Sequence, residues 1–105
     1  MWYVLNSPIL TAYGLWRFSG PIAVAQARSC LANGFVSAIG HEASARFLGA
    51  RLGMEIPVNR VNVMLNPGDS ALVLRLKQRL PEGVVLSVED MEEIDWELSL
   101  MERLE

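Results

Sequence analysis

The spacing of hydrophobic residues changes several times along the chain, which predicts an α/β domain. Residues 2–5 form a short apolar run that ends in a polar turn, as expected of a buried first strand. Residues 15–19 predict a second strand. Pro21 predicts the first turn of a helix, which runs to about residue 32 and ends at an Asn-Gly turn. Residues 35–38 predict a brief extended segment.

The middle of the chain predicts a second helix followed by a hairpin. The helix begins near Gly40 and ends before Gly53, with apolar residues on one side. Residues 61–65 and 71–76 predict two strands joined by Asn66-Pro67-Gly68-Asp69. Because proline, glycine and aspartate favour a tight turn, we expect these two strands to pair with each other.

The C-terminal part is open to two interpretations. Residues 84–86 predict a short extended piece, and Ser87 is typical of a helix N-cap, with Asp90 in the capping-box position. Beyond that point, both a helix and a strand fit the spacing of the apolar residues. We adopt a short helix to about residue 95, followed by a last strand. The whole chain then predicts one small domain (residues 1–105), a mixed β-sheet of about five strands flanked by helices.

Length and composition favour a homodimer. A chain of 105 residues buries only a small core, yet 51% of it is hydrophobic and its mean hydropathy is +0.25. Such a domain exposes apolar surface that a second copy can cover. No stretch approaches the roughly 18–20 apolar residues of a membrane span, so a cytoplasmic location without membrane contact is expected. One cysteine and one histidine are too few for a disulfide or a structural zinc site, and we expect neither metal nor cofactor.

The formal net charge of −3 conceals an uneven distribution. Residues 89–105 hold eight acidic residues and one arginine, whereas residues 1–88 hold eight basic and four acidic residues. Seven of those eight bases are arginine, whose planar fork binds phosphate in a bidentate manner. This indicates a compact anionic ligand, and the acidic end disfavours long nucleic acid. A solvated surface with an acidic end explains the distribution equally well.

His41 is the only histidine, and it lies between a predicted turn and a predicted helix. Histidine at such a position is a candidate proton donor or acceptor near neutral pH. Arginine-centred clusters follow at residues 58–61 and 78–83. Histidine, arginine and glutamate on a small scaffold are the groups needed to cleave a phosphodiester without metal, although a lone histidine is more often structural.

Two predicted element ends are candidate ligand contacts. The helix N-terminus at Gly40 offers backbone N–H groups and a positive dipole end to a phosphate. The polar pair Asn6-Ser7 follows the first strand, a common place for a ligand contact in an α/β sheet and also a plain turn signal.

Three blocks of the sequence carry a family resemblance: Ser37-Ala38-Ile39-Gly40-His41-Glu42, Asn59-Arg60-Val61 and Gln78-Arg79-Leu80-Pro81-Glu82-Gly83. With the same order and spacing, these blocks resemble the viral anti-CRISPR ring nucleases, which are antagonists of type III CRISPR defence. Relatives of that family also occur beside bacterial CRISPR systems. The resemblance implies a homodimer that binds the second messenger cyclic tetra-adenylate across its interface. It implies metal-independent cleavage to linear oligoadenylates that end in a 2′,3′-cyclic phosphate, which switches off the messenger-activated nucleases.

Residue roles follow from the resemblance by position. His41, Arg79 and Glu82 are implied as catalytic residues, Arg60 as a ligand-binding arginine, and Asn6 as a ligand contact from the first loop. The chain departs from the family pattern in two places.

A serine that some relatives carry slightly later in the first loop is absent, and Ser7 stands in for it. Arg75 occupies a position that some relatives fill with glutamine. We count Ser7, Arg75 and Gly40 among the candidate ligand-binding residues.

The chemistry fits these groups. Ring opening by the ribose 2′-OH needs in-line geometry, stabilisation of charge on phosphorus and a proton for the leaving oxygen. Arg79 and Arg60 are suited to the charge, and His41 is suited to the proton as a general acid. A helix N-terminus disfavours the imidazolium form. We therefore assign Glu82, with Glu42 as a weaker candidate, to orienting and charging the histidine.

Two other functions stay open. The first is a non-catalytic cyclic-oligoadenylate-binding sponge or sensor, which keeps the pocket without fast turnover. The second is a small dimeric DNA-binding regulator, which needs a basic recognition helix; only Arg46 and Arg51 on the second predicted helix come close.

Overall fold

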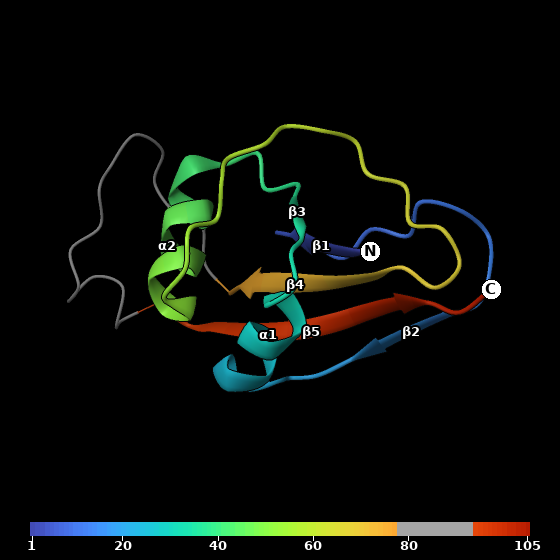
Figure 1. Cartoon of the computed structure of the whole chain (residues 1–105), viewed down its shortest axis with the longest axis horizontal. Coiled ribbons are helices and arrows are strands. Elements are labelled where there is room, and N and C mark those ends of the chain that lie inside the picture. The colour runs from blue at the N-terminus through green and yellow to red at the C-terminus, as the bar shows by residue number, and fades with distance from the viewer. Residues whose placement is uncertain (78–93) are drawn as a thin grey trace.

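A computed structural model describes residues 1–77 and 94–105, and in this part of the chain five strands form one mixed sheet (Figure 1). The order of strands is β2-β5-β4-β1-β3. The elements are β1 (Trp2–Leu5), β2 (Trp16–Ser19), α1 (Val24–Leu31), β3 (Val36–Ser37), α2 (Glu42–Leu52), β4 (Ser70–Leu76) and β5 (Trp96–Arg103). Strands β3, β1 and β4 are parallel, and β5 is antiparallel to both β4 and β2. The predicted mixed α/β sheet is confirmed.

The two faces of the sheet are covered differently. Alternate strand residues such as Val4, Leu72 and Leu98 pack with α1 and α2 in the main core, around the fully buried Phe47. The opposite face carries a smaller cluster: Leu65, Ala71, Val73 and Met101, with Tyr3, Leu5, Trp16 and Val63 around it. Among residues 1–77 and 94–105, loop residues such as Leu65 and Val63 contribute to this second cluster. Neither helix of the described residues is long and apolar enough to cross a membrane.

Most predicted elements are present with small shifts in their ends. Strands β1, β2 and β5 and helix α2 lie where the pattern places them, and the predicted extended segment at 35–38 contains β3. Helix α1 begins at Val24, later than Pro21, because the N–H of Ile22 donates to the carbonyl of Leu98 (2.8 Å) and the chain follows β5 first. The predicted strand at 84–86 lies outside the described residues, as does the predicted helix after it except for residues 94 and 95, which are not helical.

The predicted hairpin is wrong. Its turn exists, since the N–H of Asp69 donates to the carbonyl of Asn66 (2.9 Å), but residues 61–65 form no strand. Strand β4 is paired on one edge with β1 and on the other with β5, so neither edge is available to residues 61–65. Their alternating pattern has another cause: Val63 and Leu65 pack on the second face of the sheet.

Arg103, near the end of β5, joins three separate segments. Its Nη1 donates to the carbonyl of Leu65 (2.7 Å), its Nη2 to that of Tyr13 (3.2 Å) and its Nε to that of Glu105 (3.3 Å). The guanidinium also lies over the ring of Trp16, with 5.7 Å between the guanidinium carbon and the ring centroid. One side chain thus holds the β1–β2 loop and the α2–β4 loop beside each other.

We expect Arg103→Lys to lower the free energy of unfolding by about 1–2 kcal/mol, because the single nitrogen of an ammonium group cannot reach three carbonyls that are spaced to meet three separate guanidinium nitrogens. Urea unfolding followed by circular dichroism measures this change. Arg28→Lys, at an exposed position of α1, is the matched control. Equal midpoints for the two variants would show that the bridge does not stabilise the fold.

Candidate functional site

The candidate site lies beyond the carboxyl ends of two neighbouring parallel strands. Strand β1 leads into Asn6 and Ser7, and β3 leads into residues 38–41 and then α2. In α/β sheets, ligands bind at this edge, because the loops after adjacent parallel strands diverge there and leave a crevice. The sequence thus brings the polar pair after the first strand close to the turn before His41.

The segment after α2 returns to this edge and is fastened to it by hydrogen bonds. The hydroxyl of Ser37 donates to the carbonyl of Pro57 (2.6 Å), and the amide of Asn59 donates to the carbonyl of Ser37 (2.8 Å). The backbone N–H of Asn59 donates to the carbonyl of Ile39 (2.8 Å). These bonds set residues 57–60 alongside the turn that leads to α2.

These bonds place the Arg60 side chain in contact with Gly40. Its Nε donates to the Gly40 carbonyl (2.7 Å), and a Cβ placed at Gly40 would lie only 2.8 Å from the Arg60 Cγ. Glycine is therefore needed here for close approach. The two terminal nitrogens of this exposed guanidinium make no hydrogen bond within the described residues, so they are available to an anion.

His41 is the N-cap of α2. Its backbone is extended (φ −115°, ψ 119°), and its Nδ1 accepts a 3.4 Å hydrogen bond from the N–H of Ser44. The Ser44 hydroxyl lies at the same distance from Nδ1. When Nδ1 accepts, the neutral ring carries its proton on Nε2. A ring protonated on Nδ1 cannot accept from this N–H and would instead donate to the Ser44 hydroxyl.

The structure therefore joins three of the predicted site residues: Gly40, His41 and Arg60. An 11-residue helix begins at this point, and its first N–H groups and dipole attract negative charge. A guanidinium, an imidazole and a helix N-terminus in one place form an arrangement suited to a phosphate.

A pocket of about 340 Å³ adjoins this cluster. It is lined by Leu5, Asn6, Ser7, Ile9, Thr11, Ala38, Val61, Asn62, Val63 and Met64. The predicted contacts Asn6 and Ser7 both line it, and both are exposed. Ala38 connects the pocket to the turn before His41, and Val61 connects it to Arg60. The described residues thus provide a polar cluster and a mainly apolar pocket next to each other.

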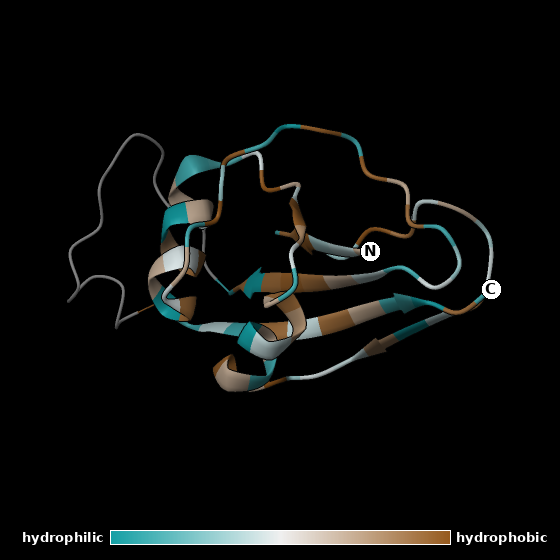
Figure 2. Ribbon diagram, viewed as in Figure 1, coloured by the Kyte–Doolittle hydropathy of each residue, from teal (hydrophilic) through white to brown (hydrophobic). Residues whose placement is uncertain are grey.

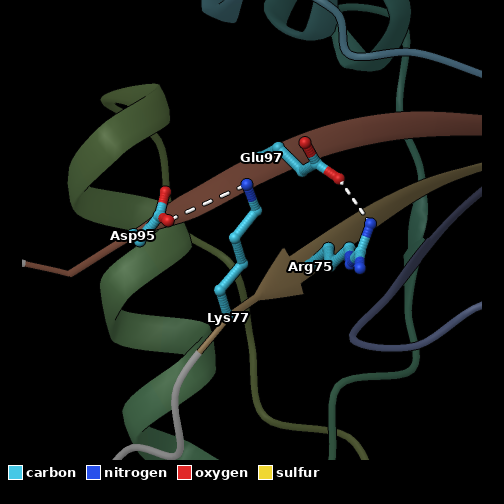
Figure 3. A network of polar contacts seen from close by, with 4 residues as sticks. All are labelled: Arg75, Lys77, Asp95 and Glu97. Atoms are coloured by element: carbon cyan, nitrogen blue, oxygen red, sulfur yellow. Dashed lines mark hydrogen bonds and ion pairs between the residues drawn. The ribbon is translucent and has the colours of Figure 1, made fainter.

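Arg75 is engaged elsewhere. Its Nη1 lies 2.9 Å from the Glu97 carboxylate, its register partner on β5 (Figure 3). Lys77 and Asp95 form a longer second ion pair nearby, at 3.8 Å. Exposed pairs of this kind contribute about 0–1 kcal/mol, so a ligand can displace Glu97 at little cost. The role predicted for Arg75 stays a prediction, and Arg79 and Glu82 lie outside the described residues.

Sequence reasoning missed the positioning residues Ser37 and Asn59. Both stand in the blocks that carried the resemblance, yet neither was given a role. The available signal was two small polar residues, Asn59 directly before Arg60 and Ser37 three residues before Gly40. The structure explains them, because each uses its side chain to fasten the two loops together.

Cys30 gives no support to thiol chemistry. Burial raises the pKa of its thiol, and the nearby Glu102 carboxylate acts in the same direction, against a smaller lowering by a backbone hydrogen bond. The thiol form is therefore favoured over the nucleophilic thiolate. In residues 1–77 and 94–105, no group of three or more histidine, cysteine, aspartate or glutamate side chains is placed to hold a metal ion.

Comparisons with known proteins agree on the family. The STIV B116-like family matches residues 2–98. Protein 26 of a Sulfolobus islandicus filamentous virus is 37% identical over 97% of this chain and 91% of its own length. YddF of Bacillus subtilis is 30% identical over 96% of this chain and 95% of its own length. The solved structure of B116 of Sulfolobus turreted icosahedral virus superposes with a TM-score of 0.81, at 21% identity, over 97% of this chain and 98% of that one, so it shows the same fold.

We expect Gly40→Ala to cost about 1–3 kcal/mol of stability in the wild type, because the added methyl group overlaps the Arg60 side chain. In an Arg60→Ala background the same substitution should cost less than about 0.5 kcal/mol. Urea unfolding of the four proteins in this cycle measures the coupling. Equal costs in both backgrounds would contradict the seating of Arg60 on Gly40.

Proposed function

The chain belongs to the STIV B116-like family, and from this premise we propose that it is a metal-independent ring nuclease acting on cyclic tetra-adenylate. The observation that carries the proposal is the seat of Arg60 on Gly40, beside His41 and the N-terminus of α2. This cluster offers one phosphate both charge stabilisation and a titratable ring. The resemblance of the three sequence blocks to the anti-CRISPR ring nucleases supplies the substrate.

The reaction requires little of the protein beyond positioning and charge. The ribose 2′-oxygen attacks the adjacent phosphorus, the bond from phosphorus to the 5′-oxygen breaks, and a 2′,3′-cyclic phosphate forms. His41 donates a proton to the departing 5′-oxygen, and the proton of the 2′-OH passes to solvent. Arg60 holds nonbridging oxygens as negative charge grows on them. Arg79 is proposed as a second clamp and Glu82 as the group that orients and charges His41.

The ligand itself completes the protonation of His41. In the capping arrangement Nδ1 accepts from the N–H of Ser44. A phosphate beside the ring favours the imidazolium form, and the Ser44 hydroxyl can accept from Nδ1–H after protonation. Binding thus converts a structural cap into a general acid.

The active form is proposed to be a homodimer in the cytoplasm. Large apolar side chains are exposed in two neighbouring loops: Ile9, Leu10, Tyr13, Leu15, Val58, Val61 and Met64. The loops are linked, because the Thr11 hydroxyl accepts from the N–H of Leu65 (3.4 Å) and Arg103 bridges both. Figure 2 shows the hydrophobic stretches in both loops. A second copy over this surface would bury them and bring two sites together around one ring.

One observation favours a second candidate, a binding module without turnover. The contacts of His41 to Ser44 are those of a helix cap, which is sufficient reason for a histidine at this position. A sponge would retain Arg60 and the pocket and lack cleavage. The DNA-binding alternative loses support, because Arg51, one of the two arginines on its recognition helix, lies over the rings of Phe47 and Trp96. In its cell, the proposed enzyme would switch off type III CRISPR signalling.

Replacement of His41 by asparagine separates catalysis from capping. Asparagine is a good N-cap but cannot transfer a proton, so we expect His41→Asn to keep the melting temperature while slowing ring cleavage about 10²–10⁴-fold. Single-turnover cleavage of labelled cyclic tetra-adenylate in EDTA measures the rate. His41→Ala is the companion variant, and it should lose both the rate and about 1 kcal/mol of stability.

Cleavage by His41→Asn at the wild-type rate would exclude His41 as the proton donor. Tight binding of the ring without any cleavage by the wild type would establish the sponge instead.

Met64→Glu should shift the protein from dimer to monomer, because a carboxylate cannot be buried without a partner. Sedimentation velocity at micromolar concentrations measures the mass. Ala25→Glu, on an exposed position of α1, is the control and should remain dimeric. A monomeric wild type, or a dimer unaffected by Met64→Glu, would place the interface elsewhere or remove it.

A further inference from the structure

We propose that the pocket beside Gly40, His41 and Arg60 is an adenine subsite, and that Asn62, which lines it, recognises the edge of the base. The inference rests on the proposed function, because it assigns the pocket to one nucleoside of the cyclic ligand. It goes beyond that function by giving a residue outside the predicted site a role in choosing the base.

The size of the pocket limits what it holds. At about 340 Å³ it is near the lower end of the range for small-molecule sites. One nucleoside fits such a space, and a ring of four does not. A ring lying across two protomers would therefore place one base in each pocket and the scissile phosphates near the Arg60 clusters.

The lining suits a flat heterocycle. Leu5, Ile9, Val63 and Met64 offer apolar surface to the faces of a base. Against this surface stand polar groups with unused hydrogen-bonding capacity: the side chains of Asn6, Ser7 and Asn62 make no hydrogen bond within the described residues. A mainly apolar pocket with a few such groups is typical of a site that fixes orientation and discriminates between ligands.

Asn62 has the chemistry to recognise adenine. A carboxamide presents one acceptor and two donors, so it can accept from the 6-amino group of adenine while donating to an adjacent ring nitrogen. Unlike Asn59, whose amide is already bonded to the Ser37 carbonyl, Asn62 is exposed and lines the pocket. Asn6 and Ser7 follow β1 at the end of the sheet and also line the pocket, where they can meet the sugar and phosphate.

Hydrogen bonds between two loops hold the walls of the pocket in place. Its two loop walls carry Ile9 and Thr11 on one side and residues 61–64 on the other. The Thr11–Leu65 hydrogen bond and the Arg103 bridge hold these walls at a fixed separation before any ligand arrives. Such preorganisation lowers the entropy cost of binding a rigid base.

The test compares two ligands on three proteins. The ligands are cyclic tetra-adenylate and the same ring built from purine riboside, which lacks only the 6-amino group. The proteins are the wild type, Asn62→Ala and Asn33→Ala, the last being the same change at an exposed position outside the pocket. Dissociation constants are measured by isothermal titration calorimetry under conditions where cleavage is blocked by a 2′-O-methyl group on every ribose.

The wild type and Asn33→Ala should prefer the adenine ring by about 10- to 100-fold. Asn62→Ala should bind the adenine ring more weakly by a similar factor and should bind the two rings nearly equally. Loss of preference is the decisive result, because a variant that is merely misfolded would weaken both ligands alike.

If Asn62→Ala keeps the full preference for the adenine ring, the subsite assignment is wrong while the ring nuclease proposal stands. If the wild type binds neither ring and does not cleave unmodified cyclic tetra-adenylate, the proposed function itself fails. A wild type that binds both rings equally would show that the pocket does not read the 6-amino group.

Discussion

The fastening of residues 57–60 onto the turn between β3 and α2 is the constraint on which the site depends. The Ser37 hydroxyl donates to the Pro57 carbonyl and the Asn59 amide donates to the Ser37 carbonyl, which places Arg60 against the carbonyl of Gly40. The same turn ends at His41, the cap of α2. A loop contact therefore determines the separation of a guanidinium and an imidazole that are 19 residues apart in sequence. Any change that frees this loop would disperse the site without unfolding the sheet.

The topology of the sheet explains why this edge is available. Strand β1 lies between its parallel neighbours β3 and β4, so the chain leaves all three strands at the same end. The two helices of the described residues pack on one face, and loop residues such as Val63 and Leu65 pack on the other. Those loops carry the pocket walls and most of the exposed apolar side chains. In the described part of the chain, the loops that cover the second face of the sheet thus also carry the proposed dimer surface.

Local signals predicted the elements whose formation depends on nearby residues. Helix α2 was predictable from Gly40 to Gly53 because its apolar side and its glycine end are local, and Gly53 does adopt the left-handed conformation (φ 66°). The irregular conformation of residues 61–65 was not predictable, because their alternation of apolar and polar residues reflects packing on the face of a sheet. Both edges of strand β4 in that sheet are already paired. For the candidate site, residue type and position pointed to His41 and to the helix N-terminus at Gly40, and the family resemblance gave Arg60 its predicted role. The roles of Ser37, Asn59 and Arg103 required tertiary contacts, since each bonds to a backbone carbonyl that no sequence pattern identifies.

The central claim is that this small domain opens a cyclic oligoadenylate with its own side chains and no metal. The most direct test is mass spectrometry of the products after incubation of the wild-type protein with cyclic tetra-adenylate in EDTA. We expect linear oligoadenylates that carry a 2′,3′-cyclic phosphate and a 5′-hydroxyl. Recovery of the intact ring after prolonged incubation with excess protein would contradict this expectation, as would linear products formed only when divalent metal is restored.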